Sequence, residues 1–454
     1  MALIIHKSSF MKFGKLLFLL VLISTQLEAQ ENIEINGAIN VNTYLSESEL
    51  PFWFYRNTEG LVKSNSNAAL SAFSSYKYKL TPLSTLEGGI SLFYRDGSLE
   101  RLQRGDLYVR FKAKHYQITL GSKSADIVNS LSSTNNNILN SGNTRPFPGL
   151  VIESPKFIPL LKNIYIDYGL GHYVLNDMRY VKNTRVHYKR INVKYTTESY
   201  GIFTAGVQHY AQWGGKSPID GDLPNSASDF FKIFLAQSGG DNSDEGEQVN
   251  ALGNHLGSFD FSYQRNFENG TLKMYHLHLF DDGSGTAFKN FPDGVWGINY
   301  AFKNNKFFKN LLYEYVDTRS QSGSSGRSGR DNYFSNKGYR SGWTYESDII
   351  GLPFFELNPE TGLGITNNRV IAHHFGAGAA TDNFYFQAKL TYLERLGTYA
   401  APFEPKQKSF LGYLSTKYNT DKFGIFNIDL GLDVKNYEKP IFGLSLGYYY
   451  TINN

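Results

Sequence analysis

Residues 426–434 read Phe-Asn-Ile-Asp-Leu-Gly-Leu-Asp-Val, with apolar residues at every even position and polar residues or glycine between them. Residues 442–452 repeat the alternation after a polar turn at 436–440. Because successive side chains of a strand point to opposite faces, the two runs predict a hairpin with one apolar face. Each run has about ten residues, roughly what a tilted strand needs to cross a bilayer. A hairpin of a soluble β-sandwich alternates in the same way, so this stretch alone leaves both classes open.

The direction of the apolar face separates these two classes. In a membrane barrel the even residues of 426–434 would face lipid, because lipid would not tolerate Asp429 and Asp433 on the other face. In a soluble sandwich the same apolar set would point into the core. We expect the membrane arrangement.

The composition favours a barrel. The chain of 454 residues has 34 Phe and 32 Tyr, and its 15% aromatic content suits the aromatic girdles of an outer-membrane barrel. A mean hydropathy of −0.36 excludes a helical membrane protein. The absence of Cys excludes a disulfide scaffold, a Cys-ligated metal site and thiol catalysis. The near balance of 45 basic and 41 acidic residues gives no electrostatic basis for binding nucleic acid.

The N-terminus has the pattern of a secretory signal. Lysines precede an apolar run at 16–23, and a small-residue cleavage site follows at 27–29. We therefore predict a signal peptide at 1–29 and a single barrel domain at 30–454. An exported chain without an apolar run long enough for a spanning helix is either a soluble β-protein or an outer-membrane barrel, because only closed barrels satisfy strand hydrogen bonds in lipid.

Short and long connections alternate loosely along the chain, as in outer-membrane barrels with short periplasmic turns and long external loops. The long ones include a Pro-rich stretch at 122–160, a stretch at 213–255 whose segment 226–236 could form a short amphipathic helix, and a Ser/Gly/Arg-rich loop at 317–342. At roughly 23 residues per strand and connection, the mature chain has room for about eighteen strands.

The sequence contains little that indicates catalysis. It has neither a Gly-x-Ser-x-Gly nor a His-Glu-x-x-His motif. His276 and His278 share one strand face and could bind a metal, but we favour a polar pair facing the lumen. Asp281-Asp282 in a Gly-rich stretch is more typical of a turn than of a glycosidase. We predict no catalytic residue, no metal and no cofactor.

Aromatic residues near the loops could stack on sugar rings. Trp213, Trp296 and Trp343 lie near Gly, Asp and Arg residues. A place in an interfacial aromatic girdle is the favoured alternative for each of them.

Several segments together show a family resemblance. The chain resembles the capsule assembly Wzi family in five segments that occur in the right order: Ser141 to Gly149 (Ser-Gly-Asn-Thr-Arg-Pro-Phe-Pro-Gly), Gly206 to Gly215 ending in Trp-Gly-Gly, Asn254 to Ser258, Asn368-Arg369 followed by His373-His374-Phe375, and Thr391 to Tyr399.

The resemblance implies a transmembrane antiparallel β-barrel of about eighteen strands in the outer membrane. It implies a lectin, not an enzyme, that binds surface polysaccharide and helps to attach or assemble the capsule. It also implies short helices closing or plugging one end, for which 67–80, which could equally be a strand, and 122–140 are candidates. The candidate polysaccharide-binding residues are Arg145, Trp213, Trp296, Arg327, Arg330 and Trp343.

An outer-membrane porin or substrate-specific channel is the alternative, since eighteen strands can enclose an aqueous pore. Long loops and a Pro-rich segment that could fill the lumen favour the lectin. Opposed Arg and acidic residues around an open lumen would favour the channel. As partners we expect capsular or other surface polysaccharide and outer-membrane lipid, no nucleic acid, and a monomeric protein.

Overall fold

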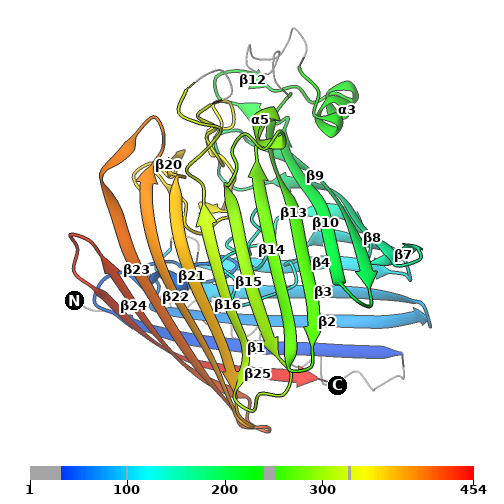
Figure 1. The fold of residues 1–454 in the computed structure, drawn as a ribbon, viewed down its shortest axis with the longest axis vertical. Helices are drawn as coiled ribbons and strands as arrows, with labels where there is room; N and C mark the ends of the chain where they lie inside the picture. Colours follow the sequence, from blue (N-terminus) through cyan, green and yellow to red (C-terminus); the bar gives the residue numbers. More distant parts are fainter. Residues whose placement is uncertain (1–31, 99–100, 240–250, 326–328, 454) are drawn as a thin grey trace.

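The computed structural model describes residues 32–453 apart from 99–100, 240–250 and 326–328. Within these residues each antiparallel wall strand pairs with the next along the chain, and the last pairs with the first, so the sheet is a closed barrel (Figure 1). β6 and β7 both pair with β8 and form one wall strand interrupted at 154–157. The described barrel therefore has 18 strands, which confirms the predicted fold class.

The wall is built from long strands, and the connections contain a few short elements. The wall strands are β1 (Ile33–Ser46), β2 (Ala68–Thr81), β3 (Ser84–Arg95), β4 (Leu102–Lys112), β5 (Gln117–Ser122), β6 (Gly149–Glu153), β7 (Ile158–Leu161), β8 (Ile164–Leu175), β9 (Thr184–Thr197), β10 (Gly201–Trp213), β13 (Asn254–Phe267), β14 (Gly270–Phe280), β15 (Gly294–Phe302), β16 (Phe308–Asp317), β21 (Val370–Ala380), β22 (Phe384–Gly397), β23 (Pro402–Asn419), β24 (Ile425–Lys435) and β25 (Ile441–Asn453). The short strands are β11 (Lys216–Ser217), β12 (Gly221–Asp222), β17 (Thr344–Tyr345), β18 (Asp348–Ile349), β19 (Glu356–Leu357) and β20 (Ile365–Asn367), and the helices are α2 (Phe52–Tyr55), α3 (Ala227–Leu235) and α5 (Gly283–Thr286). None of the helices in the described part of the chain has the length and apolar character needed to span a membrane.

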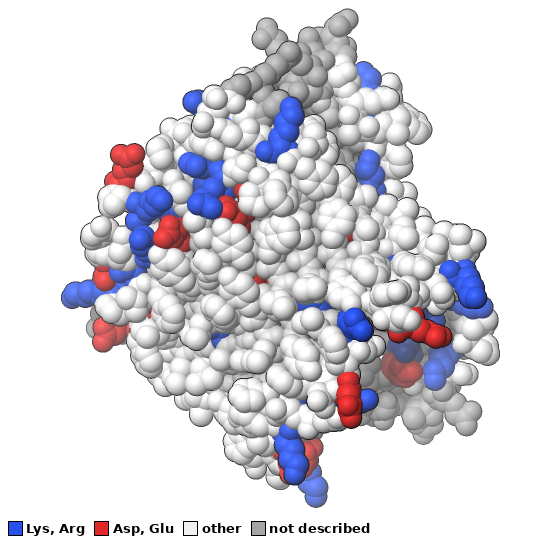
Figure 2. Space-filling view, in the orientation of Figure 1, with Lys and Arg blue, Asp and Glu red and all other residues white. Residues whose placement is uncertain are grey.

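The two faces of β24 show which side of the wall is apolar. Phe426 and Ile428 are 48% and 50% exposed on the outside. Asp433, on the opposite face, is 3% exposed, and its carboxylate accepts a 2.8 Å hydrogen bond from the backbone N–H of Phe52 inside the barrel. The even residues therefore face outward, as predicted. Figure 2 shows a broad, largely uncharged band on the outer wall over β13–β16.

The connections differ systematically between the two ends. At one end every connection is a turn of two to five residues, for example 162–163 between β7 and β8 and 268–269 between β13 and β14. The connections 47–67, 123–148 and 318–369 all lie at the other end. In outer-membrane barrels short turns are periplasmic and long loops are external, which defines the periplasmic and external ends used below.

Three long connections fold back into the lumen. We call the described parts of 47–67, 123–148 and 318–369 the plug. Its aromatic side chains join the main buried cluster, for example Phe354, which is 0% exposed. The plug is also bonded to the wall: the indole N–H of Trp53 donates to Thr391 Oγ1 at 3.2 Å.

The first part of the plug lies against the last hairpin of the barrel. A Cβ added to Gly431 of β24 would come within 2.6 Å of Pro51, and one added to Gly443 of β25 within 2.5 Å. Glycine is needed at both positions because the plug backbone approaches the wall closely here.

The helices predicted within 67–80 and 122–140 are wrong. Residues 68–81 are β2, whose mixed small and aromatic residues pair with β1 at eleven positions. The described residues 123–140 form turns, because Asn side chains bond the local backbone and compete with a helix: the Asn137 side chain accepts from the N–H groups of Leu139 and Asn140. The short helix within the plug is α2.

The short helix predicted at 226–236 is present as α3. Ser226 and Asp229 form a capping box at its N-terminus. The helix lies outside the lumen. Its Phe230 ring packs 5.5 Å from the ring of Trp213, which faces outward because the neighbouring Gln212 side chain donates to the carbonyl of Gly342 in the plug.

Candidate functional site

Two of the predicted saccharide-stacking residues are buried. Trp213 is 4% exposed on the outer wall beneath α3, and the Arg185 guanidinium lies 4.9 Å from its ring centroid. Trp343 is 3% exposed inside the plug, where its ring lies 6.3 Å from Tyr210. Both indoles contribute to packing in this conformation.

Trp296 lies on the outer wall. Its ring stacks on His276 with centroids 3.7 Å apart, and its N–H donates to the carbonyl of Pro292 at 3.0 Å. His276 therefore does not face the lumen. Tyr275, its neighbour on β14, hydrogen-bonds Glu314, and Glu314 accepts a bond from Ser132 of the plug. Tyr275 thus points inward, and the next residue in the strand points outward.

The predicted lumen-facing pair of His276 and His278 is accordingly wrong. His278 is fully buried on the outer wall because the ring of Phe288, from the external connection 281–293, stacks on it with centroids 4.4 Å apart. Alternation along a strand identifies its two faces but not which one points outward. A polar residue such as His278 can lie on the outer face because an aromatic side chain from a loop covers it.

The two described arginines among the candidates occupy different environments. Arg145 pairs with Glu346 in the plug, and its guanidinium lies 5.4 Å from the ring of Tyr345. Arg330 is exposed at the external end and donates to the carbonyl of Ser324 at 2.6 Å. Arg327 lies outside the described residues. The structure does not bring the five described candidates into one site, and the role of all six in saccharide binding stays a prediction.

A polar cavity in the periplasmic half of the lumen was not predicted. It has a volume of about 530 Å³ and lies between the plug segment 123–148 and the wall from β4 to β13. Its lining carries charged, amide and aromatic groups from neighbouring strands, including Arg110, Gln117, Glu153, Asp167, Tyr173, Arg190, Asn192, Gln208 and Asp260. The volume falls within the range of small-molecule sites.

Three charged groups of this cavity, Arg190, Asp167 and Glu153, are paired along one wall. Arg190 lies 3.0 Å from Asp167 and 3.4 Å from Glu153. Asn192 donates to Asp167 at 2.7 Å, and Gln117 donates to Glu153 at 2.8 Å. Carboxylates have four acceptor positions, so these groups keep capacity for a further donor such as a sugar hydroxyl.

Aromatic side chains border the same cavity. The rings of Tyr188 and Tyr210 lie 4.6 Å apart, and Tyr173 lies 6.4 Å from Tyr188. Aromatic faces beside amide and carboxylate groups suit a saccharide, which has apolar ring faces and a rim of hydroxyls. The sequence signal was Asp167 on β8 and the alternate polar residues Arg190, Asn192 and Lys194 on β9, visible only once the inward face is known.

Within the plug, the carboxyl group of Glu59 has a raised pKa. Burial is the main cause that raises the pKa of Glu59 to about 7, and the nearby Asp106 raises it further. The Ser124 hydroxyl donates to Glu59 at 2.8 Å and opposes this shift. Glu59 therefore titrates near neutral pH and links the plug segments 47–67 and 123–148.

A family profile decides what kind of barrel this is. The profile described as capsule assembly protein Wzi matches residues 28–370, more than half of the chain. The chain belongs to the capsule assembly Wzi family. This membership confirms the resemblance, and together with the closed barrel it places the chain in the outer membrane.

Solved structures resemble this barrel throughout. Wzi of Escherichia coli, described as an outer-membrane protein involved in group 1 capsule assembly and a carbohydrate-binding β-barrel, is 14% identical with a TM-score of 0.61, covering 91% of this chain and 84% of its own. OprD of Pseudomonas aeruginosa is 10% identical with a TM-score of 0.51, covering 93% and 94%. OccK3 of the same organism is 9% identical with a TM-score of 0.52, covering 93% and 96%. At these identities the likeness shows the fold alone. No curated protein sequence matches this chain.

Proposed function

We propose that this Wzi-family barrel is a non-catalytic, monomeric saccharide-binding protein that helps to attach or assemble the capsule. Family membership and the carbohydrate binding described for Escherichia coli Wzi support the class of function. The observation that carries it is the plug: three connections pack the lumen with buried aromatic side chains and bind the wall. This arrangement favours binding over bulk flow of solutes.

We place a saccharide site of this function in the polar lumen cavity. Arg190 with Asp167 and Glu153 offers donors and acceptors, and Tyr173 offers a ring face. Because Arg190 is paired with Asp167 and Glu153 and is not left for an anionic ligand, a neutral or weakly charged saccharide fits better than a polyanion. The external Arg330 is a second candidate contact.

A channel that accepts a small solute is the second candidate. The charged cavity favours it, because paired Arg and acidic groups also line the paths of selective pores. The family membership favours the saccharide-binding reading.

The test compares two neighbouring residues of β6. Val151 lines the cavity, whereas Leu150 is 46% exposed on the outer wall. Val151→Trp should fill the cavity and weaken binding of capsule oligosaccharides about tenfold or more, measured by calorimetry on the purified barrel, because a lost set of sugar contacts exceeds about 1.4 kcal/mol. Leu150→Trp should bind as the wild type does.

Folding of both variants is checked by the heat-dependent gel mobility of the barrel. If Val151→Trp folds and binds the oligosaccharide normally, the cavity is not the saccharide site. If the wild type binds no capsule oligosaccharide, the proposed function itself is wrong.

A further inference from the structure

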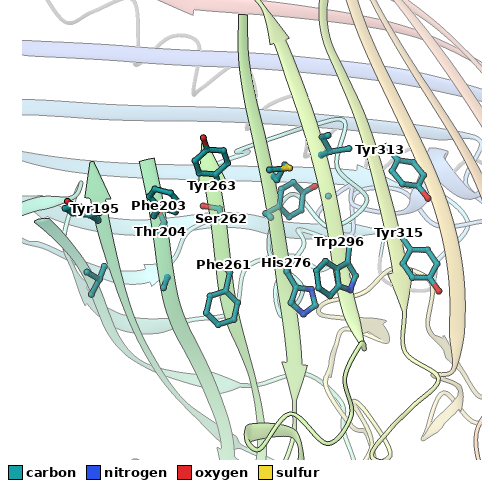
Figure 3. A pocket seen from close by; sticks show the side chains of 16 residues that line it. Tyr195, Phe203, Thr204, Phe261, Ser262, Tyr263, His276, Trp296, Tyr313 and Tyr315 are labelled. Atoms are coloured by element: carbon teal, nitrogen blue, oxygen red, sulfur yellow. The ribbon is translucent and has the colours of Figure 1, made fainter. Parts of the chain in front are cut away.

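A groove runs across the outer face of the wall, and the inner face of some of the same strands lines the lumen cavity. It has a volume of about 740 Å³ and crosses six strands from β9 to β16. Figure 3 shows the aromatic side chains that border it, with His276 and Trp296 side by side. Its outward-facing lining includes Val193, Phe203, Ala205, Phe261, Met274 and Ile298.

The groove faces the bilayer. Phe203, Phe261 and Met274 are 44%, 41% and 41% exposed, and they share the outward face with His276. Ala205 pairs with Phe261 and is small, so the wall is hollow between the larger side chains. The groove is thus a depression in the surface that contacts lipid.

A cation lies at the external side of this groove. Lys189 is on the same strand and the same face as Val193, four residues toward the external end, so the two backbones are about 13 Å apart. Its ammonium donates to the carbonyl of Phe234 at the end of α3 and lies 5.0 Å from the Phe234 ring. A lysine on a lipid-facing wall is tolerated near the interface, where headgroups begin.

The helix above Lys189 has the character of an interfacial element. Phe230 and Phe234 pack on His187 of the wall with ring centroids 5.4 Å and 5.2 Å away. Phe231 and Leu235 of the same helix remain 63% and 58% exposed. An amphipathic helix with exposed apolar residues at the membrane surface inserts them among headgroups and upper acyl chains.

We propose that this wall binds a phosphorylated, acylated glycolipid of the outer leaflet. One acyl chain lies in the groove over Ala205, and a phosphate is bound by Lys189 beneath α3. The groove continues the lipid-contacting wall, and the cation lies where an anionic headgroup would be when its chain fills the groove. The site is separate from the saccharide cavity, since the two lie on opposite faces of the same strands.

Native mass spectrometry of the full chain in mild detergent tests this proposal. The probes are a hexa-acylated diglucosamine bisphosphate, its dephosphorylated form, and a phosphatidylethanolamine. The wild type should retain the bisphosphate glycolipid at a one-to-one ratio. Ala205→Phe fills the groove and should lower retention about tenfold, because two methylenes left unburied already correspond to that factor.

Three further variants separate the contribution of the groove from that of the Lys189 charge. Ala72→Phe adds the same ring on β2, on the outward face but outside the groove, and should retain the glycolipid like the wild type. Lys189→Gln keeps a donor for the Phe234 carbonyl but removes the charge. It should bind the bisphosphate only as well as the wild type binds the dephosphorylated form, and Lys189→Arg should restore retention.

Several outcomes would overturn the proposal. One is equal retention by Ala205→Phe and the wild type. Others are equal affinity for the phosphorylated and dephosphorylated glycolipids, stronger retention of phosphatidylethanolamine, or a dimer of the chain that Ala205→Phe abolishes, which would assign the groove to a second copy.

Discussion

At the scale of single residues, Glu59 makes the plug sensitive to pH. The pKa of Glu59 is raised to about 7 in the folded state, so folding favours the protonated carboxyl. The plug therefore has its full stability below the pKa that Glu59 has in the unfolded chain. This stabilisation is lost as the pH rises through about 7. Glu59→Gln should therefore leave plug stability unchanged at pH 5 and raise it on the order of 2 kcal/mol at pH 9. Hydrogen exchange of residues 123–148, corrected for intrinsic rates, measures this; a gain of equal size at both pH values would contradict it.

At the scale of elements, β24 offers a direct test of wall orientation. With no native Cys, Ile428→Cys and Asn427→Cys each give one label site on opposite faces. A fluorophore at 428 should be quenched by lipid-borne quenchers, and one at 427 should not, because the outer wall contacts lipid. Equal quenching at both sites would refute the membrane orientation. Gly431 is unsuitable as the inward site, because a side chain there meets Pro51.

The same strand shows what the sequence could predict. The alternation at 426–434 was sufficient to predict a strand with one apolar and one polar face. The outward direction of the apolar face followed only once the chain was taken as a membrane barrel, because lipid would not tolerate Asp429 and Asp433. The position of Phe52 and Trp53 inside the lumen was not predictable. Their hydrogen-bond partners, Asp433 and Thr391, are 381 and 338 residues away in the sequence. The lumen cavity was missed for a related reason: its polar residues come from separate strands, and only the closed barrel brings them together.

At the scale of the whole molecule, the plug predicts electrical behaviour. The wild type should show no discrete conductance steps in a planar bilayer. Replacing 124–140 by a short Gly-Ser linker should produce them, because it removes most of one of the three segments that fill a lumen wide enough for an aqueous pore. Removal of 226–236 is the matched control, since α3 lies outside the lumen, and it should stay silent. Discrete steps from the wild type would favour the channel over the saccharide-binding protein.

The contact of Pro51 with Gly431 and Gly443 constrains how the barrel is made. Pro51 comes from the first connection, whereas the two glycines belong to the final hairpin, next to the seam where β25 meets β1. The final hairpin therefore serves both the seam and the first plug segment, so neither is complete without it. A chain truncated before β24 would lack the partner of β1 at the seam and the surface on which Pro51 rests.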